Sequence, residues 1–158
     1  MSGRIVVGVD GSEHSNEGLR WALDHAEKLG DSTVVAIFSW QLPLIGVPGA
    51  FDVQELEEQA KRVLNEIVDQ IAPHPKVPLE RIVAQAEATT ALVEASRGAD
   101  LLVVGTRGRN PFKGLLLGAV SQGCAANAYC PVVIVKLRSA LESDGALMEA
   151  IQPAPADG

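Results

Sequence analysis

The chain has 158 residues, of which 47% are hydrophobic and 21% charged, and its formal net charge at pH 7 is −7. This size and apolar content are typical of one globular domain that needs no metal or disulfide to fold. The acidic balance argues against indiscriminate binding to nucleic acid or to a membrane surface. Cys124 and Cys130 lack the CxxC spacing of zinc or redox sites, which predicts reduced, structural thiols. With no leader-like start and no apolar run of membrane-spanning length, the expected location is the cytoplasm.

Five apolar runs are the strands we expect, namely residues 5–9, 33–38, 81–84, 101–105 and 132–135. The first, fourth and last are almost wholly apolar, which is typical of strands covered on both faces. Helical periodicity over 19–29 and 56–71 predicts two amphipathic helices, the first of which starts near His14 and ends at Gly30. A third helix is expected to run from a cap at Thr89 or Thr90 to about Arg97, and a fourth over 115–128. The alternation of strand and helix predicts an α/β fold: a doubly wound, open, parallel five-stranded sheet with helices on both faces.

The boundaries of this single domain follow from the last expected strand. Residues 1–138 form the domain, and residues 139–158 form an acidic tail with no strand pattern, whose end we expect to be mobile. Residues 41–51 contain two prolines and two glycines and follow the second expected strand. They are either a lid segment at a ligand site or an ordinary connection.

Doubly wound sheets bind ligands outside the carboxyl ends of their strands, so the loops after the first and fourth strands are the places to search. The first strand ends in Asp10, Gly11 and Ser12. Ser12 or Asp10 is a suitable N-cap for the next helix. A carboxylate at this position is also suited to hold ribose hydroxyls or a magnesium ion.

The fourth strand opens into residues 105–121, which hold four glycines and three cations. Glycine lets backbone amides turn toward a ligand, and a following helix N-terminus adds partial positive charge, so this composition indicates phosphate binding. Neither a P-loop nor a dinucleotide GxGxxG motif is present. The window 101–138 carries five basic and no acidic residues inside an otherwise acidic chain.

The spacing of Gly105, Gly108 and Gly118 is similar to the Gly-x2-Gly-x9-Gly-(Ser/Thr) signature of the universal stress protein family, in its ATP-binding branch. The resemblance extends over about residues 3–137. One position departs from it, because Ala119 stands where the signature has Ser or Thr, while Ser121 keeps a family-like hydroxyl two residues on.

The resemblance implies a Rossmann-like, adenine-nucleotide-binding fold that holds ATP, with Mg²⁺ reaching Asp10 only through the nucleotide. It assigns ribose or metal contact to Asp10, adenine contact to the backbone near Ser39, and phosphate contact to the glycine loop. Arg107 and Arg109 join the set on charge grounds. The candidate nucleotide-binding residues are Asp10, Gly11, Ser12, Ser39, Gly105, Arg107, Gly108, Arg109, Gly118, Ala119, Val120 and Ser121.

The resemblance also implies a homodimer that pairs through the last strand, residues Val132, Val133, Ile134 and Val135. The expected function is therefore a homodimeric ATP-binding switch of the stress response. The alternatives are a nucleotide-free dimeric interaction module, in which Ala119 marks a degenerating site, a binder of a cyclic nucleotide such as cAMP, and a slow ATPase. Beyond Asp10 no general base is evident, and the three histidines show no catalytic or metal-ligand spacing, so at most weak ATPase activity is expected.

Overall fold

The computed structural model describes residues 2–43, 49–107 and 117–137. The strands are β1 (Gly3–Gly8), β2 (Ser32–Trp40), β3 (Leu79–Gln85), β4 (Leu101–Gly105) and β5 (Val132–Val135). The helices are α1 (Glu13–Leu29), α2 (Val53–Ile71), α3 (Ala88–Ala95) and α4 (Ala119–Asn127). The predicted segments 44–48 of the possible lid and 138–158 at the C-terminus lie outside the described residues.

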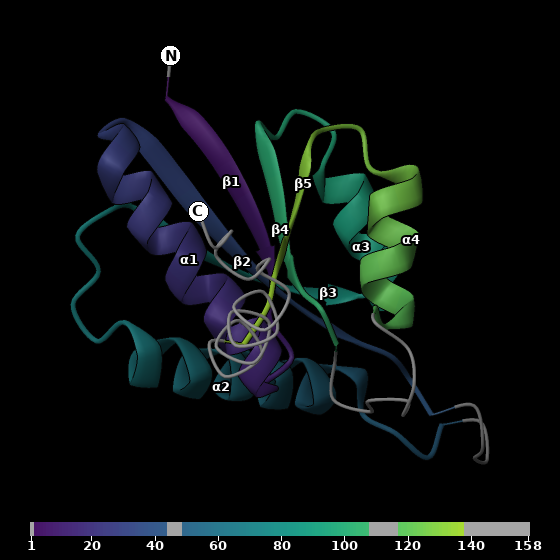
Figure 1. Cartoon of the computed structure of the whole chain (residues 1–158). Helices are drawn as coiled ribbons and strands as arrows, with labels where there is room; N and C mark the ends of the chain where they lie inside the picture. The colour runs from purple at the N-terminus through teal and green to yellow at the C-terminus, as the bar shows by residue number, and fades with distance from the viewer. Residues whose placement is uncertain (1, 44–48, 108–116, 138–158) are drawn as a thin grey trace, which may run out of the picture.

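The five strands form one parallel sheet in the order β3-β2-β1-β4-β5. The chain starts in the middle of the sheet, builds outward through β2 and β3, and then returns to the other side of β1 to add β4 and β5. Helices α1 and α2 cover one face, and α3 and α4 cover the other (Figure 1). The predicted doubly wound α/β fold is therefore confirmed, and the strand order reverses between β1 and β4.

Strand β1 shows why these runs are apolar on both faces. Ile5 and Val7 are buried with Leu19 and Leu64 under α1 and α2, whereas Val6 is buried on the opposite face. Successive side chains of a strand point to opposite faces, so a strand between two helix layers needs apolar residues at every position. The two core layers meet only across the sheet.

Helix ends follow the predicted capping chemistry at α1 and depart from it at α3. Ser12 caps α1 by accepting the Ser15 N–H, and Gly30 ends the helix with a left-handed φ of 83°. The prediction of Thr89 or Thr90 as the cap of α3 is wrong, because the carboxylate of Glu87 accepts both of their amides. Burial raises the pKa of Glu87, but these hydrogen bonds outweigh it and lower the pKa overall.

The other boundary correction concerns α4. The predicted helix began at residue 115, but α4 begins at Ala119, after Gly118 as N-cap, and Leu117 is a bend. Within α4, Cys124 is fully buried, and this burial, with a smaller effect of Glu87, raises the pKa of its thiol to about 11. A thiol of that pKa is protonated at neutral pH and poorly reactive, as expected for a structural cysteine.

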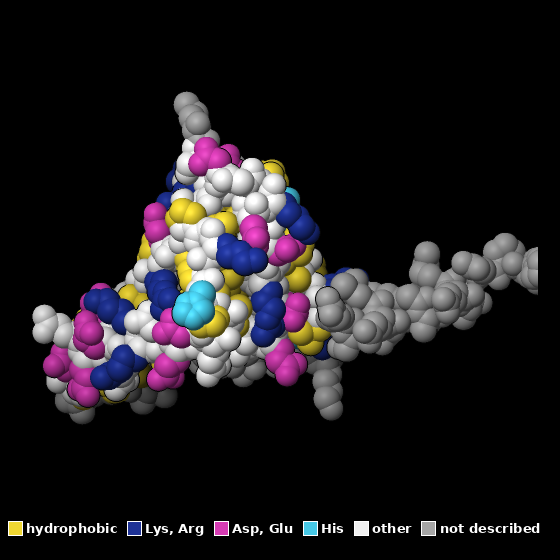
Figure 2. Space-filling view, turned by 90° about the vertical axis from the view of Figure 1, so that its left-hand side faces the viewer, with side chains coloured by type: hydrophobic (Ala, Val, Ile, Leu, Met, Phe, Trp, Pro, Cys, Tyr) yellow, Lys and Arg dark blue, Asp and Glu magenta, His cyan; other side chains and the backbone are white. Residues whose placement is uncertain are grey.

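The surface of the described segments carries mixed charge. Acidic and basic side chains alternate over the face shown in Figure 2, with apolar side chains scattered between them. Several of these charges form exposed ion pairs, such as Lys28 with Asp24 and Lys76 with Glu27. None of the helices in the described segments is both long and apolar enough to cross a membrane.

Candidate functional site

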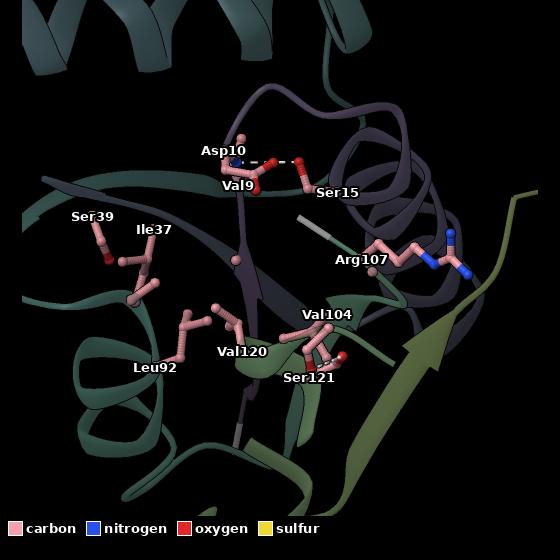
Figure 3. Close-up of a pocket in the computed structure, with 14 residues that line it drawn as sticks. Val9, Asp10, Ser15, Ile37, Ser39, Leu92, Val104, Arg107, Val120 and Ser121 are labelled. Carbon is pink, nitrogen blue, oxygen red and sulfur yellow. Dashed lines mark hydrogen bonds between the residues drawn. The ribbon is translucent and has the colours of Figure 1, made fainter. Parts of the chain in front are cut away.

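A cavity opens at the carboxyl edge of the sheet, where the strand order reverses between β1 and β4. Measured over the described residues, its volume is about 90 Å³. Its walls come from the ends of β1, β2 and β4 and from the first turns of α1, α3 and α4 (Figure 3). This is the position at which open α/β sheets bind ligands.

The inner part of the cavity is apolar. Side chains of β2, β4, α3 and α4 meet there (Figure 3), namely Ile37, Val104, Leu92 and Val120. Val9, directly after β1, also lines the cavity. Gly8 makes the close packing of α3 possible, since a Cβ atom at this position would lie 2.8 Å from Cδ1 of Leu92. The result is an apolar slot suited to a flat ring or another apolar group.

The loop after β1 supplies the acidic side of the cavity. Oδ1 of Asp10 accepts the Ser12 N–H at 2.9 Å, and the Asp10 N–H donates to Oγ of Ser15 at 3.1 Å (Figure 3). Gly11 between them has a φ of 83°, the left-handed region that favours glycine. These contacts orient the carboxylate of Asp10, which lines the cavity, while Ser12 faces α1 as its cap.

The loop after β4 meets the start of α4 at Thr106. The carbonyl of Thr106 accepts the Gly118 N–H at 2.7 Å and the Ser121 hydroxyl at 3.0 Å, and that hydroxyl has a second acceptor in Gly118 O at 3.0 Å. The hydroxyl of Thr106 pairs with Nδ1 of His14 at 2.7 Å. Ser121 is 2% exposed, so its hydroxyl is directed to the protein backbone and its amide belongs to the first turn of α4.

The N-terminus of α4 differs from those of the other described helices. Side chains cap the first turns of α1, α2 and α3, through Ser12, Asp52 and Glu87. Gly118 has no side chain to cap α4, and within the described segments no side chain accepts a hydrogen bond from the first amides of this helix. The first amides of a helix lack intrahelical acceptors and carry partial positive charge, so α4 presents an anion-binding helix end to the cavity.

The structure brings many of the predicted site residues to this cavity. Those that line it are Asp10, Ser39, Gly105, Arg107, Gly118, Val120 and Ser121. Gly11, Ser12 and Ala119 are adjacent in the chain but do not line it, and Gly108 and Arg109 lie outside the described residues. In the described part of the chain, no cluster of three or more His, Cys, Asp or Glu side chains is arranged to hold a metal ion.

Apart from Val120, sequence reasoning missed the apolar part of the site, and it also missed the contact between His14 and Thr106. Ile37 and Val104 lie near the carboxyl ends of β2 and β4. This is the edge of the sheet at which doubly wound folds bind ligands. No sequence pattern predicts that Leu92 lines the cavity, because its position depends on how α3 packs on Gly8. Trp40, the last residue of β2, is not among the residues that line the cavity and packs against the core beneath α1 and α2.

Comparison with known proteins gives a consistent match. Residues 1–136 match the model of the Universal stress protein family. A universal stress protein of Mycolicibacterium smegmatis is 33% identical over 138 residues, 85% of this chain and 46% of the relative. Universal stress protein MJ0531 of Methanocaldococcus jannaschii is 31% identical over 140 residues, 84% of this chain and 81% of the relative. The chain thus spans about half the length of the mycobacterial relatives that it matches.

Solved structures share the fold. Hypothetical protein MJ0577 matches with a TM-score of 0.73 at 21% identity, covering 87% of this chain and 98% of that one. A universal stress protein in complex with cAMP matches with a TM-score of 0.66 at 24% identity, over 84% and 96% of the two chains. The Archaeoglobus fulgidus protein in complex with dAMP has a TM-score of 0.59 at 24% identity, over 85% and 98%. An Arabidopsis thaliana family member with AMP bound has a TM-score of 0.59 at 16% identity, over 87% and 94%.

Proposed function

Because the chain belongs to the universal stress protein family, we propose that the cavity between β1 and β4 binds an adenine nucleotide and that this binding acts as a stress-response switch. The observation that carries the proposal is the N-terminus of α4, which no described side chain caps, beside an apolar slot. A base fits the slot, the carboxylate of Asp10 is positioned for ribose hydroxyls, and a phosphate group is attracted to the amides of α4. Complexes of fold neighbours with cAMP, AMP and dAMP support an adenine nucleotide as ligand.

We propose ATP as the specific ligand, with Mg²⁺ held on its phosphates and reaching Asp10 through them. The adenine lies by the backbone near Ser39, and Arg107 adds a cation beside the phosphates. Gly108 and Arg109, from the same glycine-rich segment, complete the phosphate contacts in this proposal. The proposed site also includes Gly11 and Ser12, in the loop after β1, and Ala119, at the start of α4.

The binding test is isothermal titration calorimetry of the whole chain with ATP and Mg²⁺, AMP and cAMP. We expect saturable binding that Val120→Phe weakens about tenfold or more, because the larger ring fills a cavity of about 90 Å³. Ala126→Phe is the matched control, since Ala126 is exposed on the same helix. Absence of binding at millimolar nucleotide, with no thermal stabilisation, would contradict the proposal.

A second expected result concerns the family hydroxyl that this chain lacks. Ala119 is exposed at the first position of α4, where a serine hydroxyl could reach a bound phosphate. Ala119→Ser should tighten ATP binding by about 2- to 10-fold, the effect of one neutral hydrogen bond. If neither form binds nucleotide by calorimetry, the nucleotide-free interaction module is the better description.

We also propose that the chain forms a homodimer through β5. In the sheet that the described residues form, β3 and β5 are the edge strands. β3 exposes Glu80 and Arg81, charges that discourage further strand pairing. β5 consists of Val132–Val135, all half-buried and without charge. An apolar open edge favours pairing, and a two-fold copy of the same strand closes it.

A further inference from the structure

Thr106 is the residue at which the parts of the cavity wall are joined. It is 6% exposed and follows directly after β4. Its N–H donates to Val135 O at 3.2 Å, and its carbonyl accepts the amide of Gly118 at 2.7 Å. Its hydroxyl lies 2.7 Å from Nδ1 of His14, in the first turn of α1. One residue thus bonds to β5, to the start of α4 and to α1.

The carbonyl of Thr106 determines where α4 begins. No side chain of the described residues caps this helix. The bond from the Gly118 amide to Thr106 therefore holds the N-cap residue in place, and the Ser121 hydroxyl adds a second bond to the same oxygen. The amides that follow Gly118 are those that we assign to the phosphate. A rotation of the Thr106 peptide would therefore turn the helix end away from the cavity.

His14 is well suited to restrain that peptide, because its own backbone is held in place. A Cβ atom on Gly105 would lie only 2.6 Å from the backbone carbon of His14, so β4 and α1 are in close contact here. Neither His14 nor Thr106 lines the cavity. Any effect of the two on a ligand is therefore indirect, and the bonds from Thr106 to Gly118 and Ser121 make α4 the best-connected route.

We infer that His14 and Thr106 are positioning residues, whose hydrogen bond aims the first amides of α4 at the phosphate of a bound nucleotide. The inference rests on the proposed function, since it requires a phosphate-bearing ligand in this cavity. The inference distinguishes the phosphate contribution to the binding free energy from the contribution of base and ribose. The pair supports the phosphate contacts and leaves the contacts of base and ribose unchanged.

The test compares AMP with adenosine, which has the same base and ribose but no phosphate. Amide NMR titration gives dissociation constants even in the millimolar range and follows Ala119, Val120 and Ser121 directly. Thr106→Val removes the hydroxyl and keeps the side-chain shape. His14→Phe keeps a ring and removes the nitrogen that pairs with the Thr106 hydroxyl. Each change should weaken AMP binding about 3- to 10-fold, as expected for one hydrogen bond, and leave adenosine binding unchanged.

Three further variants make the result specific. Thr106→Ser keeps the hydroxyl and should bind AMP like the unaltered chain. Thr33→Val makes the same change at the amino end of β2, far from the cavity, and should change neither ligand. The double variant of His14 and Thr106 should lose no more AMP affinity than either single variant, because both remove the same bond.

The outcomes separate this inference from the proposed function. Equal losses for AMP and adenosine, or no loss for either, would overturn the positioning role while nucleotide binding stands. If the unaltered chain binds neither ligand, the proposed function fails and the inference fails with it. Should Thr106→Val not fold, His14→Phe and Thr106→Ser still decide the question.

Discussion

Replacement of Gly105 by alanine is expected to lower the free energy of unfolding by about 3 kcal/mol and to abolish nucleotide binding. The added Cβ atom would lie 2.6 Å from the backbone carbon of His14 and 2.7 Å from its carbonyl oxygen. Backbone atoms cannot swing aside as a side chain can, so α1 must move away from β4. That movement breaks the bond between His14 and Thr106. Urea denaturation measures the loss, which corresponds to roughly 6–12 °C in Tm for a chain of this size.

Gly18 provides the matched control from the other side of the same contact. A Cβ atom on Gly18 would have its nearest neighbours, the Gly105 nitrogen and Cγ1 of Val103, at 3.7 Å, which is ordinary contact. Because Gly18 lies inside α1, Gly18→Ala should stabilise the protein by about 0.5–1 kcal/mol through helix propensity. Equal stability of Gly105→Ala and the unaltered chain would show that α1 and β4 are not in close contact.

Ile134→Pro is expected to convert the proposed dimer to a monomer without unfolding the chain. The Leu102 N–H donates to Pro131 O, and the Thr106 N–H donates to Val135 O. Backbone groups of alternate residues point to opposite sides of a strand, so the N–H of Ile134 points to the open edge. Proline removes that N–H and leaves the bonds to β4 intact. Sedimentation velocity at tens of micromolar chain should show the change in mass.

Ile134→Ala separates the backbone effect from the loss of the side chain. It removes the same apolar contacts with the core beneath α3 and α4 but keeps the N–H, so it should remain dimeric. If Ile134→Pro stays dimeric, the edge of β5 is not the interface. If the unaltered chain is monomeric at these concentrations, the dimer proposal fails, whatever the result for nucleotide binding.

The fold was predictable because its main signals are local. Runs such as Val132–Val135 have no polar residue, and only strands covered by helices on both faces tolerate that pattern. Boundaries were less predictable where two local choices compete. At α3, Glu87 reaches the amides of Thr89 and Thr90, although threonine is the commoner cap.

Asp10 and Gly105 were predictable as site candidates from their place at the ends of strands, and Gly118 was predictable from the spacing of the glycines. The apolar slot was harder to predict from the sequence, because Leu92 reaches it only through the packing of α3 on Gly8. The hydrogen bond between His14 and Thr106 could not be predicted from a sequence pattern, since it joins residues 92 positions apart. Each of these depends on tertiary packing rather than on the neighbours in the chain.

The position of β1 in the middle of the sheet has a consequence for the order in which the protein is made. During synthesis, Asp10 and α1 emerge early, and β2 and β3 can pair outward from β1 while the other side of β1 is still open. The cavity has no second wall until β4 docks there, and α4 follows later still. A nascent chain that ends before β4 therefore has its acidic loop but no binding site. The proposed nucleotide binding therefore requires that translation and folding have passed the fourth strand.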